Sequence, residues 1–137
     1  RGIFTERDLI RLLAKMTFSG IVESIMTTNV ITIPPDVDLL FASKLMEYEG
    51  IRRLPVVKGR EVEGIITAAD VVKALAKGFH TVSEIETKNP LSISSTDTIM
   101  KAVRIMNEKR VGCLLVDGIK GIVTERDVLY ASLNEIR

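Results

Sequence analysis

The chain has 137 residues, 46% hydrophobic and only 4% aromatic, and its 19 basic and 18 acidic residues give a net charge of +1. This length suits one compact domain or two small repeats with a shared core. The balanced charge supplies no field that would hold DNA or RNA, so nucleic acid is not an expected partner. One cysteine and one histidine cannot build an internal disulfide or a structural zinc site, so no metal is expected.

Hydropathy gives no reason to expect a membrane protein. No apolar stretch of the sequence reaches the roughly 20 residues that span a bilayer, and no secretory signal is recognisable. We therefore predict a cytoplasmic protein with no membrane partner.

A short segment occurs three times in the chain. Residues 64–71 (GIITAADV) return at 121–128 (GIVTERDV), and residues 2–9 (GIFTERDL) form a third copy. Upstream of the first two, a shift of 60 residues (82 − 22) superimposes Val22 on Val82 and keeps matching without gaps over many positions. Self-similarity of this kind indicates a repeat architecture. We predict two full repeats and a fragment of a third.

Each repeat has the same predicted order of elements: strand, helix, strand, strand, helix. In the first repeat, residues 30–33 form a short strand that two prolines end, because proline cannot continue a ladder. Apolar residues at helical spacing then predict a helix that ends at Gly50. Strands over 54–57 and 62–66 follow, and the turn that joins them is the place where the second repeat is shorter.

The last helix of each repeat begins after a threonine, Thr67 or Thr124. In the first repeat, we expect this helix to bury Val71, Val72 and Leu75. One such unit is too small to cover both faces of its own sheet, so the two repeats are expected to pack together.

The motifs of each repeat resemble a cystathionine-β-synthase (CBS) motif. In the first repeat, residues 26–34, 51–57 and 64–70 carry the resemblance, and residues 82–128 carry it in the second. The resemblance covers nearly the whole chain. It implies an α+β protein with the α/β-type CBS fold, in which two pseudo-symmetric β-α-β-β-α repeats pack through their sheets as a Bateman module.

The same resemblance divides the sequence into three parts. We predict CBS motif 1 over residues 17–79 and CBS motif 2 over residues 80–137. Residues 1–16 resemble the tail end, strand and helix, of a preceding CBS motif, with a native linker helix as the alternative. If residues 1–16 are the tail end of a preceding CBS motif, we expect a longer parent protein with further CBS copies.

The Thr-x-x-Asp pattern is the first candidate ligand site, as Thr67 with Asp70 and Thr124 with Asp127. Free backbone N–H groups at a helix start favour an anion, and an acidic residue can accept hydrogen bonds from ribose hydroxyls. In the resembling family, this aspartate holds the ribose. The pattern is also close to a capping box, which needs no ligand, and the two roles can coexist.

The resemblance further implies a flat apolar slot for an adenine ring. Isolated apolar residues also fit ordinary core positions, and each one taken singly is better explained by packing. The expected wall residues are Ile31, Ile51, Ile65, Leu91, Val111 and Ile122.

Cations for a phosphate are unequally distributed between the repeats. Arg52 and Arg53 stand where similar family members reach phosphate oxygens, with solvated surface arginines as the alternative. The second repeat has Gly112 and a cysteine there. Gly112 would let a ligand approach the backbone, and Arg126 would supply the missing cation. We therefore expect two unequal sites.

The function that the resemblance implies is regulatory. Family members commonly bind AMP, ADP, ATP or S-adenosyl-methionine in clefts between the repeats and regulate an attached or partner protein. The sequence has no Ser/His/Asp or Cys/His set, no Walker loop and no dinucleotide fingerprint. We therefore predict no catalytic residue and no catalytic cofactor, with an adenine nucleotide as regulatory ligand.

Two other functions stay open. A dimerisation scaffold without ligand would need apolar helix faces beyond those of the core, and Phe41, Leu45 and Tyr48 share one such face. A nucleic-acid-binding CBS protein is the weaker alternative, because the net charge argues against it. Whatever the function, the resemblance implies a homodimer or pairing with another CBS module.

Overall fold

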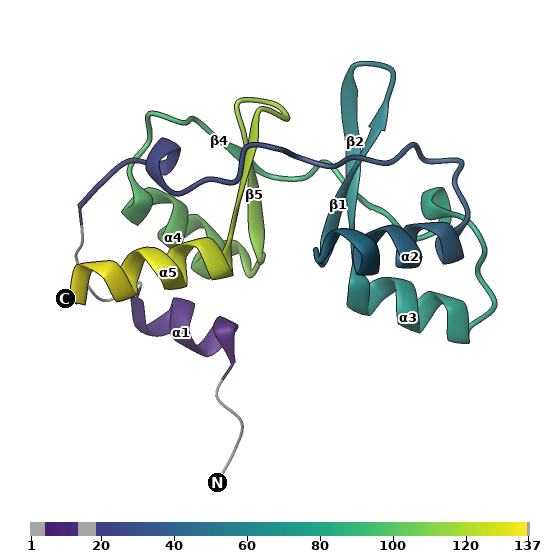
Figure 1. Ribbon diagram of the computed structural model, residues 1–137, viewed down its shortest axis with the longest axis horizontal. Coiled ribbons are helices and arrows are strands. Elements are labelled where there is room, and N and C mark those ends of the chain that lie inside the picture. Colours follow the sequence, from purple (N-terminus) through teal and green to yellow (C-terminus); the bar gives the residue numbers. More distant parts are fainter. Residues whose placement is uncertain (1–4, 14–18, 137) are drawn as a thin grey trace, which may run out of the picture. The chain divides into compact units, whose positions relative to one another are not determined.

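The computed structural model describes residues 5–13 and 19–136, which form two compact units (Figure 1). Unit 1 is the described part of residues 1–30 and 91–137, and unit 2 is residues 31–90. The segment that leads into each repeat, residues 19–30 for the first and 80–90 for the second, is called its lead segment. Each lead segment belongs to the unit that contains the strands of the other repeat. This exchange of lead segments follows from no pattern in the sequence, and the predicted division at residues 79 and 80 stays a prediction.

Unit 2 is a three-stranded antiparallel sheet, in the order β1-β2-β3, with two helices packed on each other. Its elements are α2 (Leu39–Glu49), β1 (Arg53–Lys58), β2 (Glu61–Thr67), α3 (Ala68–Ala76), the short 3-10 helix η2 (Val82–Glu84) and β3 (Thr87–Lys88). Helix α2 begins where the Asp38 side chain accepts the Leu40 N–H at 2.7 Å, and it ends at Gly50, whose φ of +68° glycine adopts without strain.

Two details of unit 2 differ from the sequence expectation. The predicted strand at 30–33 is reduced to one bridge between Ile33 and Val56. In α3 the prediction that Val72 and Leu75 are buried is wrong, since 66% and 38% of their surfaces are exposed. Val71 and Ala74 are the buried residues of this helix, and Ala68 packs partly against the core, because a short helix on a small sheet buries a narrow stripe.

Unit 1 repeats the arrangement with one extra helix. Its elements are α1 (Glu6–Leu13), the 3-10 helix η1 (Val22–Ser24), β4 (Ser92–Ile93), α4 (Ile99–Lys109), β5 (Cys113–Val116), β6 (Gly121–Thr124) and α5 (Glu125–Ile136). Strand β5 lies between β4, which is parallel to it, and β6, which is antiparallel. Helix α1 packs against α5 and α4 (Figure 1). The start of the strand-helix tail predicted over residues 1–16, where its strand was expected ahead of α1, lies outside the described residues.

Each lead segment lies antiparallel beside the strand that runs into the helix of the Thr-x-x-Asp pattern, β6 in unit 1 and β2 in unit 2. In unit 1, Thr27 exchanges two backbone hydrogen bonds with Ile122, of 2.8 and 2.9 Å. In unit 2 the corresponding Thr87 pairs with Ile65 as part of β3. These pairings bring residues from the lead segment next to the start of the final helix, where the Thr-x-x-Asp pattern lies.

The described part of the chain contains no helix long and apolar enough to cross a membrane. Within the same residues, no three histidine, cysteine or acidic side chains are grouped so that they could hold a metal ion.

Candidate functional site

Thr124 and Asp127 form a reciprocal cap at the start of α5. The Asp127 N–H donates to the Thr124 hydroxyl at 3.3 Å. In return, the Thr124 N–H and hydroxyl donate to Oδ2 of Asp127 at 2.9 and 3.1 Å. The capping interpretation of the pattern therefore describes this site correctly, and any ligand must use the acceptor capacity that remains.

Thr27 supplies a third donor to the same carboxylate. Its hydroxyl donates to Oδ1 of Asp127 at 3.3 Å, because the backbone pairing with Ile122 fixes Thr27 beside β6. A carboxylate offers about four acceptor positions, so three donors leave room for one more. Thr27 was not among the predicted site residues, although its repetition as Thr87 was a usable signal.

The surroundings of Asp127 raise the pKa of its side chain above the usual value of an aspartate. Burial raises the pKa of Asp127, whereas the hydrogen bonds from Thr124 and Thr27 and the charge of Arg126 lower it without cancelling the effect of burial. A half-buried carboxylate with spare acceptor capacity is well suited to hydroxyl donors such as those of a ribose.

Asp70 in unit 2 takes part in fewer capping hydrogen bonds than Asp127. Its N–H donates to the Thr67 hydroxyl at 3.2 Å, but no described residue donates to its carboxylate. The third copy of the pattern, Thr5 with Asp8, has the return bond, with the Thr5 N–H donating to Oδ2 of Asp8 at 3.0 Å. The Asp70 carboxylate therefore has more acceptor positions free for a ligand, whereas the Asp127 carboxylate is held more firmly in place.

A pocket of about 330 Å³ in unit 2 contains two of the predicted residues, Ile51 and Arg52. It lies between the end of α2 and the start of α3, and the Arg52 carbonyl accepts the Ala68 N–H at 2.8 Å. Ligand pockets begin at about 300 Å³. Its other described lining residues are Ser43, Met46, Glu47, Gly50, Ala68, Val71 and Val72.

The two predicted arginines have different surroundings. Arg52 is exposed at the pocket, beside the first residue of α3, and its guanidinium can meet an anion at that helix start. Arg53 begins β1, is half-buried and already has an interaction partner. Arg52, which is exposed and lines the pocket, is therefore the stronger candidate for phosphate.

The corresponding position in unit 1, at the start of α5, has an acidic residue and no counterpart of Arg52. Gly112 takes the position of Arg52, and its carbonyl accepts the Glu125 N–H at 3.2 Å. Glu125, in the place of Ala68, is a buried acid. Arg126, which the sequence offered as the compensating cation, lies 3.5 Å from Glu6 of α1 as an ion pair. Unit 1 is thus less suited to a phosphate than unit 2.

The predicted adenine walls are mainly parts of the two cores. Ile31 and Ile51 pack against the core of unit 2, and Val111 against that of unit 1. Ile122 is buried in β6, and Ile65 is half-buried in β2. Leu91 is exposed, and its carbonyl accepts the Leu115 N–H at 3.0 Å.

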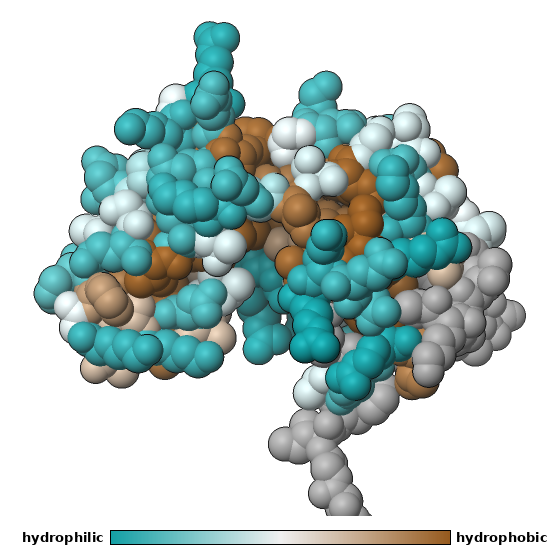
Figure 2. Space-filling model, turned by 180° about the vertical axis from the view of Figure 1, so that it is seen from behind, coloured by the Kyte–Doolittle hydropathy of each residue, from teal (hydrophilic) through white to brown (hydrophobic). Residues whose placement is uncertain are grey.

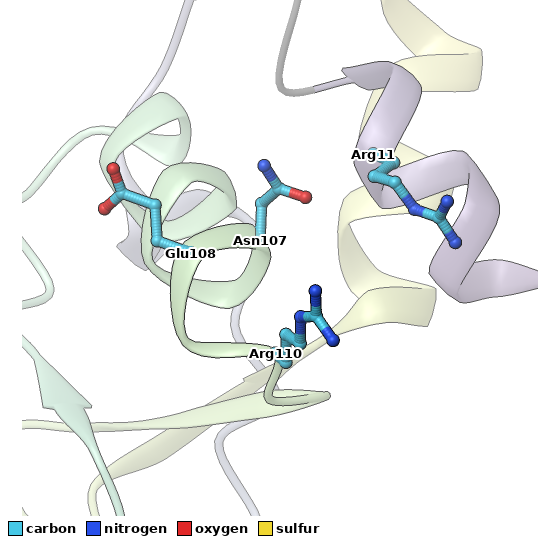
Figure 3. A pocket seen from close by; sticks show the side chains of 4 residues that line it. All are labelled: Arg11, Asn107, Glu108 and Arg110. Atoms are coloured by element: carbon cyan, nitrogen blue, oxygen red, sulfur yellow. The ribbon is translucent and has the colours of Figure 1, made fainter.

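A second pocket, of about 610 Å³, lies in unit 1 and contains none of the predicted residues. Figure 3 shows its described lining side chains, Arg11 of α1 with Asn107, Glu108 and Arg110 at the end of α4. Arg11 is already bound to Asp8 at 2.9 Å, and Glu108 adds a negative charge, so the pocket is not a strongly cationic site.

The comparisons with known proteins agree with the repeat pattern. The CBS domain family matches residues 22–77 and 82–134. An uncharacterized 33.4 kDa protein in a ribosomal RNA operon of Thermofilum pendens is 35% identical over 93% of this chain and 49% of its own. Protein MJ1225 of Methanocaldococcus jannaschii is 33% identical over 93% of this chain and 53% of its own. The chain thus spans about half the length of these relatives.

Solved structures give the same result. MJ1225, described as a proposed archaeal homologue of γ-AMPK, has a TM-score of 0.78 at 29% identity over 94% of this chain and 54% of its own. The CBS domain pair of protein MJ0100, in complex with 5′-methylthioadenosine and S-adenosyl-L-methionine, has a TM-score of 0.81 at 26% identity over 86% of this chain and 99% of its own. The chain belongs to the CBS domain family and carries a tandem pair of CBS repeats.

Proposed function

We propose that this CBS pair is a regulatory module that binds an adenosine-containing ligand and shifts the conformational equilibrium of an attached or partner protein. The observation that carries the proposal is the geometry at Asp127, a half-buried carboxylate with three donors fixed at a helix start and one acceptor position left. The adenosine derivatives bound by the CBS pair of MJ0100 support it. The chain itself is proposed to be non-catalytic.

The two units are proposed to differ in the ligand group that they contact. In unit 2, Arg52 beside the start of α3 favours a phosphate, as in AMP, ADP or ATP. In unit 1, the buried acid Glu125 and the glycine at 112 favour an uncharged or positive group, as in 5′-methylthioadenosine or S-adenosyl-methionine. A ligand regulates only to the extent that it prefers one conformation of the protein.

Thermal unfolding with millimolar ligand tests this proposal. A ligand that binds only the folded chain raises its free energy of unfolding, by about 2.7 kcal/mol at one hundred times the dissociation constant. We expect at least one of AMP, ATP, 5′-methylthioadenosine and S-adenosyl-methionine to raise the melting temperature. The increase should be lost in Asp127→Asn or Asp70→Asn.

Asp8→Asn is the matched control, because Asp8 shares with Asp127 the two reciprocal bonds that involve backbone N–H groups and is not a predicted site residue. If Asp8→Asn abolishes the ligand effect as fully as the other two variants, the carboxylates act through folding alone. If none of the four ligands changes the melting temperature of the wild type, the proposal is wrong.

The second candidate is a dimerisation scaffold without ligand. Helix α2 exposes 55% of Phe41 and 86% of Tyr48, as the sequence predicted for an interface, whereas Leu45 packs partly on the core. Figure 2 shows that hydrophobic side chains are also exposed among hydrophilic ones on the face turned away from the viewer in Figure 1. The scaffold interpretation predicts a dimer by sedimentation that Tyr48→Glu dissociates with no ligand present. The dimer and the cytoplasmic location stay predictions.

A further inference from the structure

A buried carboxylate lies beneath the edge of the unit 2 sheet. The side chain of Glu86, just before β3, is 0% exposed, and its Oε1 has no hydrogen-bond partner among the described residues. Its Oε2 lies 3.4 Å from the Lys88 ammonium. Burying a charge with so little compensation is costly, and a carboxyl group avoids the cost by taking up a proton.

A second carboxylate shares the same ammonium. Oε2 of Glu63, on β2, lies 3.1 Å from Nζ of Lys88, so two acids compete for one cation. Burial raises the pKa of Glu86, and hydrogen bonding and charge from Glu63 raise it further, against a lowering by Lys88. Hydrogen bonding with Glu86 and with Lys88 lowers the pKa of Glu63, and Lys58 on β1 acts in the same direction.

The backbone beside Glu86 is closely packed. A Cβ atom at Gly64 would lie 2.4 Å from Oε1 of Glu86 and 2.6 Å from the Thr87 carbonyl, so β2 has room for glycine only. Strand β3 is held by two residue pairs, Gly64 with Lys88 and Ile65 with Thr87. This short edge strand is therefore sensitive to any repulsion that develops beneath it.

Unit 1 has the same construction without a charge. A shift of 60 residues (86 − 26) puts Met26 in the place of Glu86, and a Cβ atom at Gly121 would meet the Met26 sulfur at 2.7 Å. The fold therefore accepts a neutral apolar side chain at this position. The acid in unit 2 is not a requirement of packing.

We propose that Glu86, Glu63 and Lys88 form a proton-operated clasp that fixes β3 to β2 in unit 2. When Glu86 is protonated, the Lys88 ammonium serves Glu63 alone and the edge strand stays paired. When Glu86 ionises, two carboxylates share one ammonium and the segment that carries Thr87 loosens from β2. Unit 1, with Met26, stays unaffected. The clasp is independent of the ligand proposed above.

The sign of the pH effect follows from the raised pKa of Glu86. Between the unfolded-state pKa of about 4.3 and the folded-state pKa, the folded chain holds more protons than the unfolded one. The free energy of unfolding therefore falls as the pH rises through this window. Glu86→Gln imitates the protonated acid, so its free energy of unfolding should not fall with pH on account of this residue. The difference in the free energy of unfolding between the variant and the wild type should therefore grow as the pH rises.

Hydrogen exchange and carboxyl NMR test the clasp directly. In the wild type, the Glu86 carboxyl carbon should titrate above pH 4.3, and Lys88→Met should move its midpoint upward. Protection of the Thr87 amide, corrected for its intrinsic exchange rate, should fall with rising pH by at least tenfold relative to that of Thr27. In Glu86→Gln and Glu86→Met the two amides should keep a constant ratio.

The exposed Glu61 lies on β2, as Glu63 does, and provides the control variant Glu61→Gln, which should behave like the wild type. A Glu86 midpoint at or below 4.3 overturns the proposal. An unchanged pH dependence of Thr87 protection in Glu86→Gln also overturns it. The carboxyl titration is made on the wild type, so it decides the question even if a variant fails to fold.

Discussion

The hydroxyl of Thr27 donates a 3.3 Å hydrogen bond to Oδ1 of Asp127, a residue one hundred positions later in the chain. The bond joins the lead segment of the first repeat to the final helix of the second, both within unit 1. It links the exchange of lead segments to the candidate site, because Asp127 would otherwise have donors only from its own cap.

Removing this hydroxyl should change the titration of Asp127. In Thr27→Val, the pKa of Asp127 should rise further, because the lost hydrogen bond lowers it in the wild type. Carboxyl-carbon NMR measures the midpoint, and the neighbouring Thr28→Val is the control at an exposed position. An Asp127 midpoint that stays the same in both variants would show that the Thr27 bond is not formed in solution.

The two caps should differ in their contribution to stability. Thr124→Val removes the bond that caps α5 and one donor of the return interaction, whereas Thr67→Val removes a capping bond only. We expect a loss of about 1 kcal/mol in the free energy of unfolding for Thr67→Val and a larger loss, up to about 2 kcal/mol, for Thr124→Val. Urea denaturation measures both, and the reverse order would contradict the assigned bonds.

The repeat pattern explains how much of this fold could be predicted. The helix that ends at Gly50 and the strands on either side of the hairpin lie where hydrophobic periodicity places them. The burial of Val72 and Leu75 was predicted wrongly. Periodicity shows that a side of a helix is apolar, but it does not show how wide a stripe the neighbouring sheet covers.

The candidate site could be predicted only where it is local in the sequence. Thr124 and Asp127 are three residues apart, and their contact follows from helix geometry. The bond from Thr27 and the ion pair of Arg126 with Glu6 join distant segments. No local pattern contains these contacts, because they depend on which strand each lead segment pairs with.

Alanine at Gly64 should be more damaging than alanine at Gly121. At Gly64 the new methyl group meets a backbone carbonyl and a buried carboxylate, whereas at Gly121 its nearest neighbour is the flexible Met26 side chain. We expect Gly64→Ala to lower the free energy of unfolding by about 1–3 kcal/mol and Gly121→Ala by less. Equal losses in thermal denaturation would mean that the buried Glu86 gives way as easily as the thioether of Met26.

Glycine at position 110 should stabilise the chain. Arg110 ends α4 with a φ of +55°, a left-handed conformation that its counterpart Gly50 adopts without strain. We expect Arg110→Gly to raise the free energy of unfolding by about 0.5–1 kcal/mol, measured by urea denaturation. If the variant is instead less stable, the Arg110 side chain makes a stabilising contact in the pocket of Figure 3.

Ligand binding by this CBS pair can be measured by calorimetric titration of the chain with 5′-methylthioadenosine and with AMP, with amide NMR spectra recorded at saturation. We expect saturable binding of at least one of them, with the amides of Thr124 and Asp127 or of Thr67 and Asp70 among the most shifted. Binding should weaken at least tenfold when the aspartate of the shifted pair is changed to asparagine. The absence of heat and of shifts at millimolar concentrations of both ligands would contradict the proposed ligand binding and favour the scaffold without ligand.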